Sequence, residues 1–187
     1  MTFEPRRRWA SGLPGFAKTT DMRVNQLGVA LCSYYDDGWG ALVRAARTQG
    51  VGYDDALVDA AAQALRAHWQ TLDAPPTLVA AVPSLRRPAL VADFAARLAL
   101  KLGVRLVNAL QHTKQHPPQS EMRNSFQQAA NIINHFVVSA PLRHESILLV
   151  DDIADSKWTL TVLGDLLQRH DAGAVHPFAL AVTNTSD

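Results

Sequence analysis

The most informative segment of the sequence for the fold is Ile147-Leu-Leu-Val-Asp-Asp-Ile-Ala-Asp-Ser-Lys-Trp-Thr-Leu160. Its first four residues are apolar, which is typical of a parallel strand covered on both faces. Asp151 and Asp152 follow, and then a short polar turn opens a helix. Because open α/β sheets bind ligands outside the carboxyl ends of their strands, we expect a binding site here. Two carboxylates at that place suit a ribose diol or a magnesium-bound sugar phosphate.

The turn that follows the acids adds possible contacts for an anion. Ser156 and Thr159 lie where a helix N-terminus can hold a phosphate. Paired acids after a buried strand also commonly serve as helix caps, and the residues alone leave both interpretations open.

The composition is that of an ordinary folded protein. With 187 residues, of which 48% are apolar and 19% charged, the chain is normally one domain with a sizeable core. Its formal net charge of +1 gives no global reason to expect a polyanion as partner. Nucleic-acid binding would therefore depend on a local patch such as Arg6-Arg7-Arg8.

Cysteine content and hydropathy indicate the compartment. Cys32 is the single cysteine, so an intrachain disulfide and a cysteine metal cluster are excluded. No run approaches the roughly 18 consecutive apolar residues of a membrane span. We expect a cytoplasmic protein that has no membrane partner.

The chain divides by pattern into residues 1–76 and residues 77–187. The first part is expected to form an irregular N-terminal arm (1–28) and a helical cap, with helices over about 41–49 and 54–72. The second part alternates strands with helices, which predicts a parallel sheet with right-handed crossovers. Its expected strands are 77–82, 104–110, 136–138, 146–150 and 174–182, and its expected helices are 88–102, 121–133 and 158–170.

The segment from Ile147 to Leu160 resembles the phosphoribosyl-pyrophosphate (PRPP) signature of type I phosphoribosyltransferases. That signature is an apolar strand, two acids, three residues, a Thr and a small-residue turn that closes on Thr. The resemblance implies an α/β fold of the type I phosphoribosyltransferase kind, with a parallel sheet flanked by helices and an N-terminal helical cap. It also implies that Asp151 and Asp152 bind the ribose hydroxyls and, indirectly, Mg²⁺.

The resemblance assigns roles to the turn as well. It implies that the loop holds the 5′-phosphate through its backbone amides, and the residues concerned are Ser156, Lys157, Trp158 and Thr159. Asp155 falls on the position that hypoxanthine-guanine phosphoribosyltransferases use as general base. The family usually has glycine directly after its Thr, whereas this chain has Lys157-Trp158.

Two further segments match places where the family binds or covers its ligand. The loop Ser84-Leu85-Arg86-Arg87 follows the first strand of residues 77–187, where the family binds pyrophosphate. Either arginine could offer a fork of donors to phosphate, and two solvated arginines at a helix start are the alternative. A long polar segment is expected to be a flexible loop over the reacting centre, and it carries Lys114, Gln119, Arg123 and Asn124.

Two narrower resemblances concern DNA metabolism. Pro118-Gln119, Arg123-Asn124 and Phe126-Gln-Gln-Ala129 are similar to ComF-like proteins, which are linked to DNA uptake. Val82-Pro-Ser-Leu-Arg86, Pro117-Pro-Gln119, Ser156-Lys-Trp-Thr159 and Pro177-Phe-Ala-Leu180 extend over nearly the whole chain. They are similar to the region that follows the helicase core in some bacterial RecQ-type DNA helicases. There is no Gly-x-x-x-x-Gly-Lys-Ser/Thr phosphate loop, so a helicase motor is not expected.

These resemblances leave two main hypotheses. The first is a domain that binds PRPP or a related ribose phosphate with Mg²⁺ and, if it is an active enzyme, transfers the phosphoribosyl group to a nitrogenous base. The alternative is a non-catalytic accessory domain of DNA metabolism, with a RecQ-type helicase or DNA as its partner. A regulator that senses PRPP without turnover is a third possibility.

Overall fold

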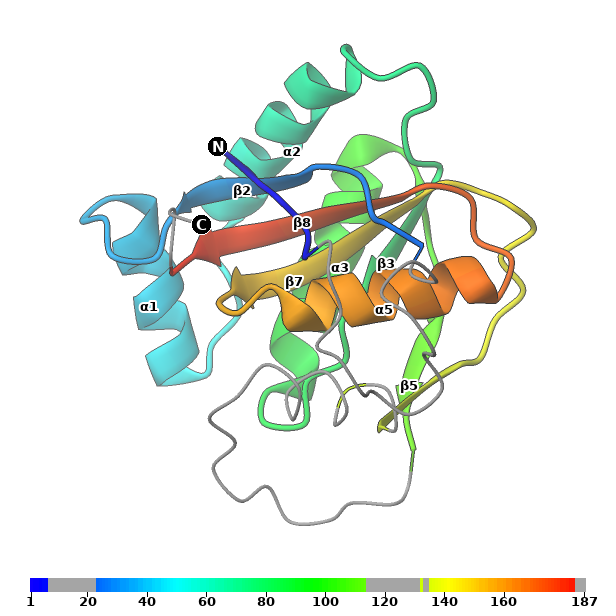
Figure 1. Ribbon diagram of the computed structural model, residues 1–187. Helices are drawn as coiled ribbons and strands as arrows, with labels where there is room; N and C mark the ends of the chain where they lie inside the picture. Colours follow the sequence, from blue (N-terminus) through cyan, green and yellow to red (C-terminus); the bar gives the residue numbers. More distant parts are fainter. Residues whose placement is uncertain (7–22, 114–131, 133–134, 184–187) are drawn as a thin grey trace.

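The computed structural model describes residues 1–6, 23–113, 132 and 135–183. Within these residues, six strands form one sheet in the order β1-β2-β8-β7-β3-β4 (Figure 1). The pairs β2–β8, β8–β7, β7–β3 and β3–β4 are parallel, and β1 joins β2 antiparallel. The strands are β1 (Thr2–Phe3), β2 (Gly28–Ser33), β3 (Leu78–Ala81), β4 (Arg105–Leu106), β7 (Ile147–Ala154) and β8 (Val175–Val182). The predicted α/β fold with a mostly parallel sheet is confirmed.

Helices cover both faces of this sheet. One face carries α1 (Trp39–Gln49), α2 (Asp55–Trp69) and α3 (Pro88–Leu102), and the other carries α5 (Trp158–Arg169) (Figure 1). A small antiparallel pair, β5 (Leu110–His112) and β6 (Phe136–Val138), lies on the α5 side. Within the described part of the chain, no helix has both the length and the apolar character that crossing a membrane requires.

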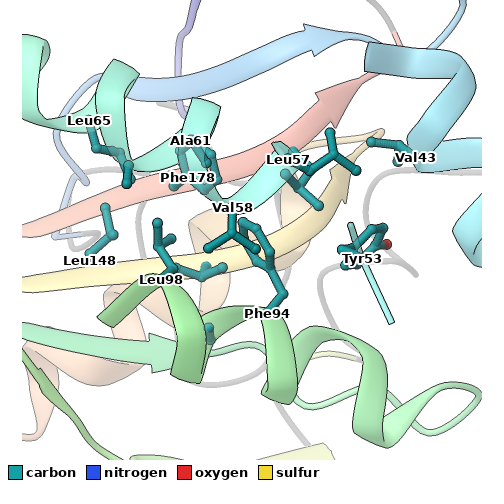
Figure 2. Close-up of a cluster of buried hydrophobic side chains, with 14 of the residues drawn as sticks. Val43, Tyr53, Leu57, Val58, Ala61, Leu65, Phe94, Leu98, Leu148 and Phe178 are labelled. Atoms are coloured by element: carbon teal, nitrogen blue, oxygen red, sulfur yellow. The ribbon is translucent and has the colours of Figure 1, made fainter. Parts of the chain in front are cut away.

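The strand β7 has buried side chains on both faces. Leu148 and Val150 belong to the core cluster under α1, α2 and α3, whereas Ile147 and Leu149 belong to the cluster under α5. Figure 2 shows the first cluster, in which Phe94 of α3 packs against the sheet, with its ring stacked on that of Phe178 in β8 at 6.3 Å between centroids. Because successive side chains of a strand alternate between the faces, a continuous apolar run is what two-sided burial requires.

The helices begin and end close to where the sequence predicts. Asp54 caps α2 by accepting a hydrogen bond from the backbone N–H of Ala56 at 2.8 Å. Pro88 is the first residue of α3, and Gly103 ends that helix in a left-handed conformation with φ of 74°. The predicted range 88–102 is therefore confirmed.

The strand β7 is longer than the predicted 146–150. It continues to Ala154 because β8 runs alongside it, with Asp151 opposite Ala179. Its other neighbour stops earlier, since the last β3 pair joins Ala81 to Val150. The two acids therefore lie inside the strand, at a point where it is still paired with β8 but no longer with β3.

Residues before 77 contribute to the sheet itself. β2 pairs in parallel with β8, so the expected boundary at residue 76 runs through one continuous sheet. No strand was predicted there, because residues 28–33 are a short apolar run after an irregular segment. The strand expected over 104–110 is divided between β4 and β5, and the helix expected over 121–133 lies outside the described residues except for residue 132.

Candidate functional site

A small pocket lies at the carboxyl edge of the sheet, between the end of β7 and the start of α5. Its volume is about 70 Å³. The lining residues are Asp151, Ile153, Ala154, Asp155, Ser156, Lys157, Thr159 and Leu160. The structure thus brings together five of the residues that the sequence nominates for ribose phosphate binding and catalysis.

The loop between β7 and α5 has a left-handed residue where the signature usually has glycine. Lys157 has φ of 63° and precedes the first helical residue, Trp158. A non-glycine residue in this conformation costs about 1–2 kcal/mol, so the loop keeps a glycine-like backbone at some expense in stability. The side chains of Lys157 and Trp158 are both buried. Trp158, which does not line the pocket, is a core residue.

Asp151 is the acid of the pair that faces the pocket. Its Oδ1 accepts a hydrogen bond from the backbone N–H of Asp152 at 2.8 Å. Burial, and then the neighbouring carboxylate of Asp152, raise the pKa of Asp151 well above its usual range. The ionised form of Asp151 is therefore disfavoured in the empty pocket, and a cation or a set of hydroxyl donors bound there would stabilise it.

Asp152 lies on the opposite face of β7 and does not line the pocket. Only 7% of its surface is exposed, and its Oδ2 forms an ion pair with Arg47 of α1. The same oxygen accepts a hydrogen bond from the hydroxyl of Tyr53 at 2.9 Å. Burial, together with the charge of Asp152, raises the pKa of Tyr53, so the phenol remains a donor. The two predicted ribose ligands are therefore not brought together.

The predicted pyrophosphate loop follows β3 at the same edge of the sheet. Leu85 and Arg86 are exposed, whereas Arg87 is half-buried. The backbone N–H of Arg87 donates to Ser84 Oγ at 3.1 Å, and its Nε donates to the carbonyl oxygen of Arg47 at 2.9 Å. Arg86 thus extends outward, while Arg87 holds the loop against the end of α1.

Asp155, the predicted general base, is exposed at the mouth of the pocket. Its Oδ1 accepts a hydrogen bond from the hydroxyl of Thr183, just after β8. Thr183 fixes the orientation of the carboxylate, and no local sequence pattern indicated it.

The N-terminal segment also reaches this region. The backbone N–H of Arg6 donates to Thr161 Oγ1 at 3.1 Å, and its Nε donates to the carbonyl oxygen of Ser156 at 3.2 Å. From the sequence, Arg6 was predicted only as part of a basic run that could contact nucleic acid. No sequence pattern indicated that Arg47 and Tyr53 belong to this region, because their partner, Asp152, lies 105 and 99 residues away in the chain.

The predicted flexible-loop residues Lys114, Gln119, Arg123 and Asn124 lie outside the described residues. His112, at the beginning of that segment, makes a hydrogen bond between its Nε2 and the carbonyl oxygen of Pro83 at 3.1 Å. The start of the segment is therefore anchored beside the predicted pyrophosphate loop.

No protein-family model and no curated protein sequence matches this chain. Among solved structures, it is similar to adenine phosphoribosyltransferase from Leishmania tarentolae, with 14% identity, a TM-score of 0.43, and coverage of 67% of this chain and 70% of that one. It is also similar to purine phosphoribosyltransferase from Pyrococcus horikoshii, with 20% identity, a TM-score of 0.44, and coverage of 71% and 76%. A hypoxanthine phosphoribosyltransferase from Staphylococcus aureus has 13% identity, a TM-score of 0.43, and coverage of 71% and 66%.

Proposed function

We propose that this chain binds PRPP or a related ribose phosphate with Mg²⁺, and that it transfers the phosphoribosyl group to a nitrogenous base. The observation that carries the proposal is the pocket at the carboxyl edge of the sheet, which joins the Asp151 carboxylate to the loop that opens α5. A ribose phosphate has two chemically different ends. The hydroxyls suit the carboxylate, and the phosphate suits the start of the helix.

The phosphate would be held by the loop from Ser156 to Thr159. The first backbone N–H groups of a helix have no partner within it, and the helix dipole favours negative charge at this end. The left-handed Lys157 turns the backbone into α5 at this point, and Lys157 also lines the pocket.

Mg²⁺ fits the pocket as part of a complex with the ligand. Mg²⁺ prefers oxygen ligands and usually keeps several waters while one or two carboxylates and substrate phosphates hold it. Asp151 and Asp155 both line the pocket, whereas Asp152 is paired with Arg47. Among the described residues, no group of three or more His, Cys, Asp or Glu side chains could hold a metal ion. When bound, Mg²⁺ would neutralise phosphate charge.

The reaction would break the bond between ribose C1 and the pyrophosphate oxygen, and it would form a bond from C1 to a nitrogen of the base. The electron pair of the broken bond leaves with pyrophosphate, and the sugar passes through a centre of oxocarbenium character. Asp155 would accept the proton that the base nitrogen loses. Thr183 holds that carboxylate at the mouth of the pocket. The exposed Arg86 would meet the departing pyrophosphate.

Calorimetry with PRPP and Mg²⁺ tests the proposal. The wild-type chain is expected to bind, and Asp151→Asn is expected to weaken binding by about tenfold or more, because a charge-assisted hydrogen bond is lost. Asp37→Asn, which removes an exposed acid outside the pocket, is the matched control. Absence of binding at millimolar ligand, or unchanged binding in Asp151→Asn, would rule the proposal out.

Turnover is measured separately, as pyrophosphate release in the presence of candidate bases. Binding without release would indicate a domain that senses PRPP. The DNA-metabolism alternative predicts salt-dependent binding of single-stranded or forked DNA, or copurification with a helicase, and no affinity for PRPP.

A further inference from the structure

The buried acid Asp152 belongs to a network that leads away from the pocket. Arg47 and Tyr53 both contact the same carboxylate oxygen, Oδ2. Arg47 comes from α1, and Tyr53 comes from the segment between α1 and α2. Two elements on one face of the sheet thus converge on a single acid of β7.

Tyr53 is itself held on two sides. Its carbonyl oxygen accepts a hydrogen bond from Arg97 Nη2 at 2.6 Å, and its ring packs edge-on against Phe94 with 5.7 Å between ring centroids. Because Tyr53 is only 2% exposed, its hydroxyl has a fixed place from which to donate to Asp152. The network is therefore a rigid support rather than a surface contact.

The same network reaches the predicted pyrophosphate loop. The carbonyl oxygen of Arg47 accepts the hydrogen bond from Arg87 Nε at 2.9 Å, and the backbone N–H of Arg87 is bound to Ser84 Oγ. Arg47 lies in the last turn of α1, where carbonyl groups lack helical partners and where a positive side chain is favoured. A continuous chain of contacts thus runs from Asp152 through Arg47 to the loop at Ser84–Arg87.

We propose that Asp152 is a positioning residue that acts through Arg47 on the Ser84–Arg87 loop. Asp151 is then the member of the acid pair that meets the ribose, and Asp152 sets the loop that meets the pyrophosphate end of the ligand. This inference rests on the proposed function, and it assigns different parts of the ligand to two adjacent acids.

The test divides PRPP into its two halves. Binding of ribose 5-phosphate, of magnesium pyrophosphate and of magnesium PRPP is measured by calorimetry for wild type, Asp151→Asn, Asp152→Asn, Arg47→Met and Arg47→Lys. Asp151→Asn is expected to weaken ribose 5-phosphate by about tenfold. Asp152→Asn and Arg47→Met are expected to leave ribose 5-phosphate within about twofold and to weaken pyrophosphate and PRPP by about tenfold.

Arg47→Lys restores the charge that pairs with Asp152 and is expected to recover part of the pyrophosphate affinity. Tyr53→Phe keeps the ring and removes one hydrogen bond, so it provides a mild variant should Arg47→Met fold poorly. Arg105→Met is the matched control, because it removes an exposed ion pair with Glu145 at the amino-terminal edge of the sheet. The proposal is overturned if Asp152→Asn weakens ribose 5-phosphate as much as Asp151→Asn does, or if it leaves pyrophosphate affinity unchanged.

Hydrogen exchange separates this inference from the proposed function. Without any ligand, the backbone amides around Ser84–Arg87 are expected to exchange faster in Asp152→Asn and Arg47→Met than in wild type or Arg105→Met. If no variant binds ligand but this difference is seen, the proposed function fails and the coupling stands. If exchange at the loop is the same in all variants, the coupling itself is wrong.

Discussion

Asp151 and Asp152 are neighbours in the sequence, yet they belong to two different regions of the molecule. Asp151 faces the pocket beside α5, where no basic side chain among the described residues forms an ion pair with it. Asp152 lies on the face under α1–α3, where Arg47 and Tyr53 hold it. Strand geometry produces this separation, because consecutive side chains point to opposite faces.

The difference between these regions shows that two adjacent residues of the same type can lie in opposite electrostatic environments. A buried charge with partners contributes to the structure, and removal of one partner leaves the other charge buried and unpaired. A buried carboxylate whose negative charge has few positive partners or hydrogen-bond donors destabilises the fold. Such groups are commonly found at binding and catalytic sites. The contrast predicts that equivalent substitutions at the two acids have opposite effects on stability.

The largest effect is expected from Arg47→Met, which removes the ion-pair partner of Asp152. The variant leaves Asp152 buried without its ion pair, and we expect a loss of about 3 kcal/mol in the free energy of unfolding. Urea denaturation measures this loss. Arg105→Met, which breaks an exposed pair, should cost less than about 1 kcal/mol. Similar losses in both variants would show that the Asp152 region is not specially supported.

His176 is a second buried polar group on the face under α1–α3, and it is expected to make the stability of the fold depend on pH. It is 5% exposed, neither ring nitrogen has a hydrogen-bond partner among the described residues, and burial together with nearby His68 lowers its pKa from 6.5 to about 4. The unfolded chain binds this proton more readily. Stability from the neutral ring is therefore present above pH 6.5 and is lost as the pH falls toward 4.

We expect His176 to account for about 1–2 kcal/mol of the stability lost between about pH 7 and about pH 5. His176→Leu should flatten that part of the pH profile, measured by urea denaturation at several pH values. His170→Leu, at the exposed end of α5, is the control and should leave the slope in place. An unchanged slope in His176→Leu would contradict the assignment.

Asp151→Asn tests how the acid that faces the pocket affects the stability of the fold. The folded pKa of Asp151 lies above its unfolded value of 3.8, so the group costs stability progressively as the pH rises above that value. We expect the variant to be more stable than wild type at neutral pH, by on the order of 1 kcal/mol, and Asp152→Asn to be less stable. Thermal denaturation of both variants and of Asp37→Asn checks the sign. A loss of stability in Asp151→Asn would contradict the comparison.

The smallest effect concerns the two ends of α5, each of which has a left-handed residue. Lys157 lies in the pocket, whereas Asp171 lies after the helix with φ of 65° and is exposed. Asp171→Gly should gain about 0.5–1 kcal/mol by relieving a strained backbone, with no change in ligand affinity. Asp171→Ala, which relieves no strain, should show no such gain. Equal effects of the two substitutions would indicate that the backbone conformation at this end carries no cost.

Much of the fold could be predicted from local pattern. The predicted ranges of α2 and α3 agree closely with the structure, because the residues that mark their ends, Asp54, Pro88 and Gly103, act within one turn of the chain. The strand β2 was not predicted, because its apolar residues are explained only by their burial between β8 and the helices. The end of β7 was predicted too early, because the pairing with β8 extends the strand to Ala154.

The candidate site divides in the same way. The loop from Asp155 to Thr159 was predicted as a unit, because its residues are adjacent in the sequence and follow one strand. Arg6, Arg47 and Thr183 were not predicted as part of it, since each reaches the site from a remote segment.

Local pattern was sufficient to predict a buried strand that ends in two acids and a polar turn, and hence a candidate ribose phosphate site at residues 151–159. Which of the two acids faces the pocket depends on how remote segments pack against β7. Alternation along β7 could assign the acids to opposite faces, but α1 and Tyr53 determine which of those faces is closed. The physical reason is that partners for a buried charge come from wherever the chain packs, and a local sequence pattern does not contain that information.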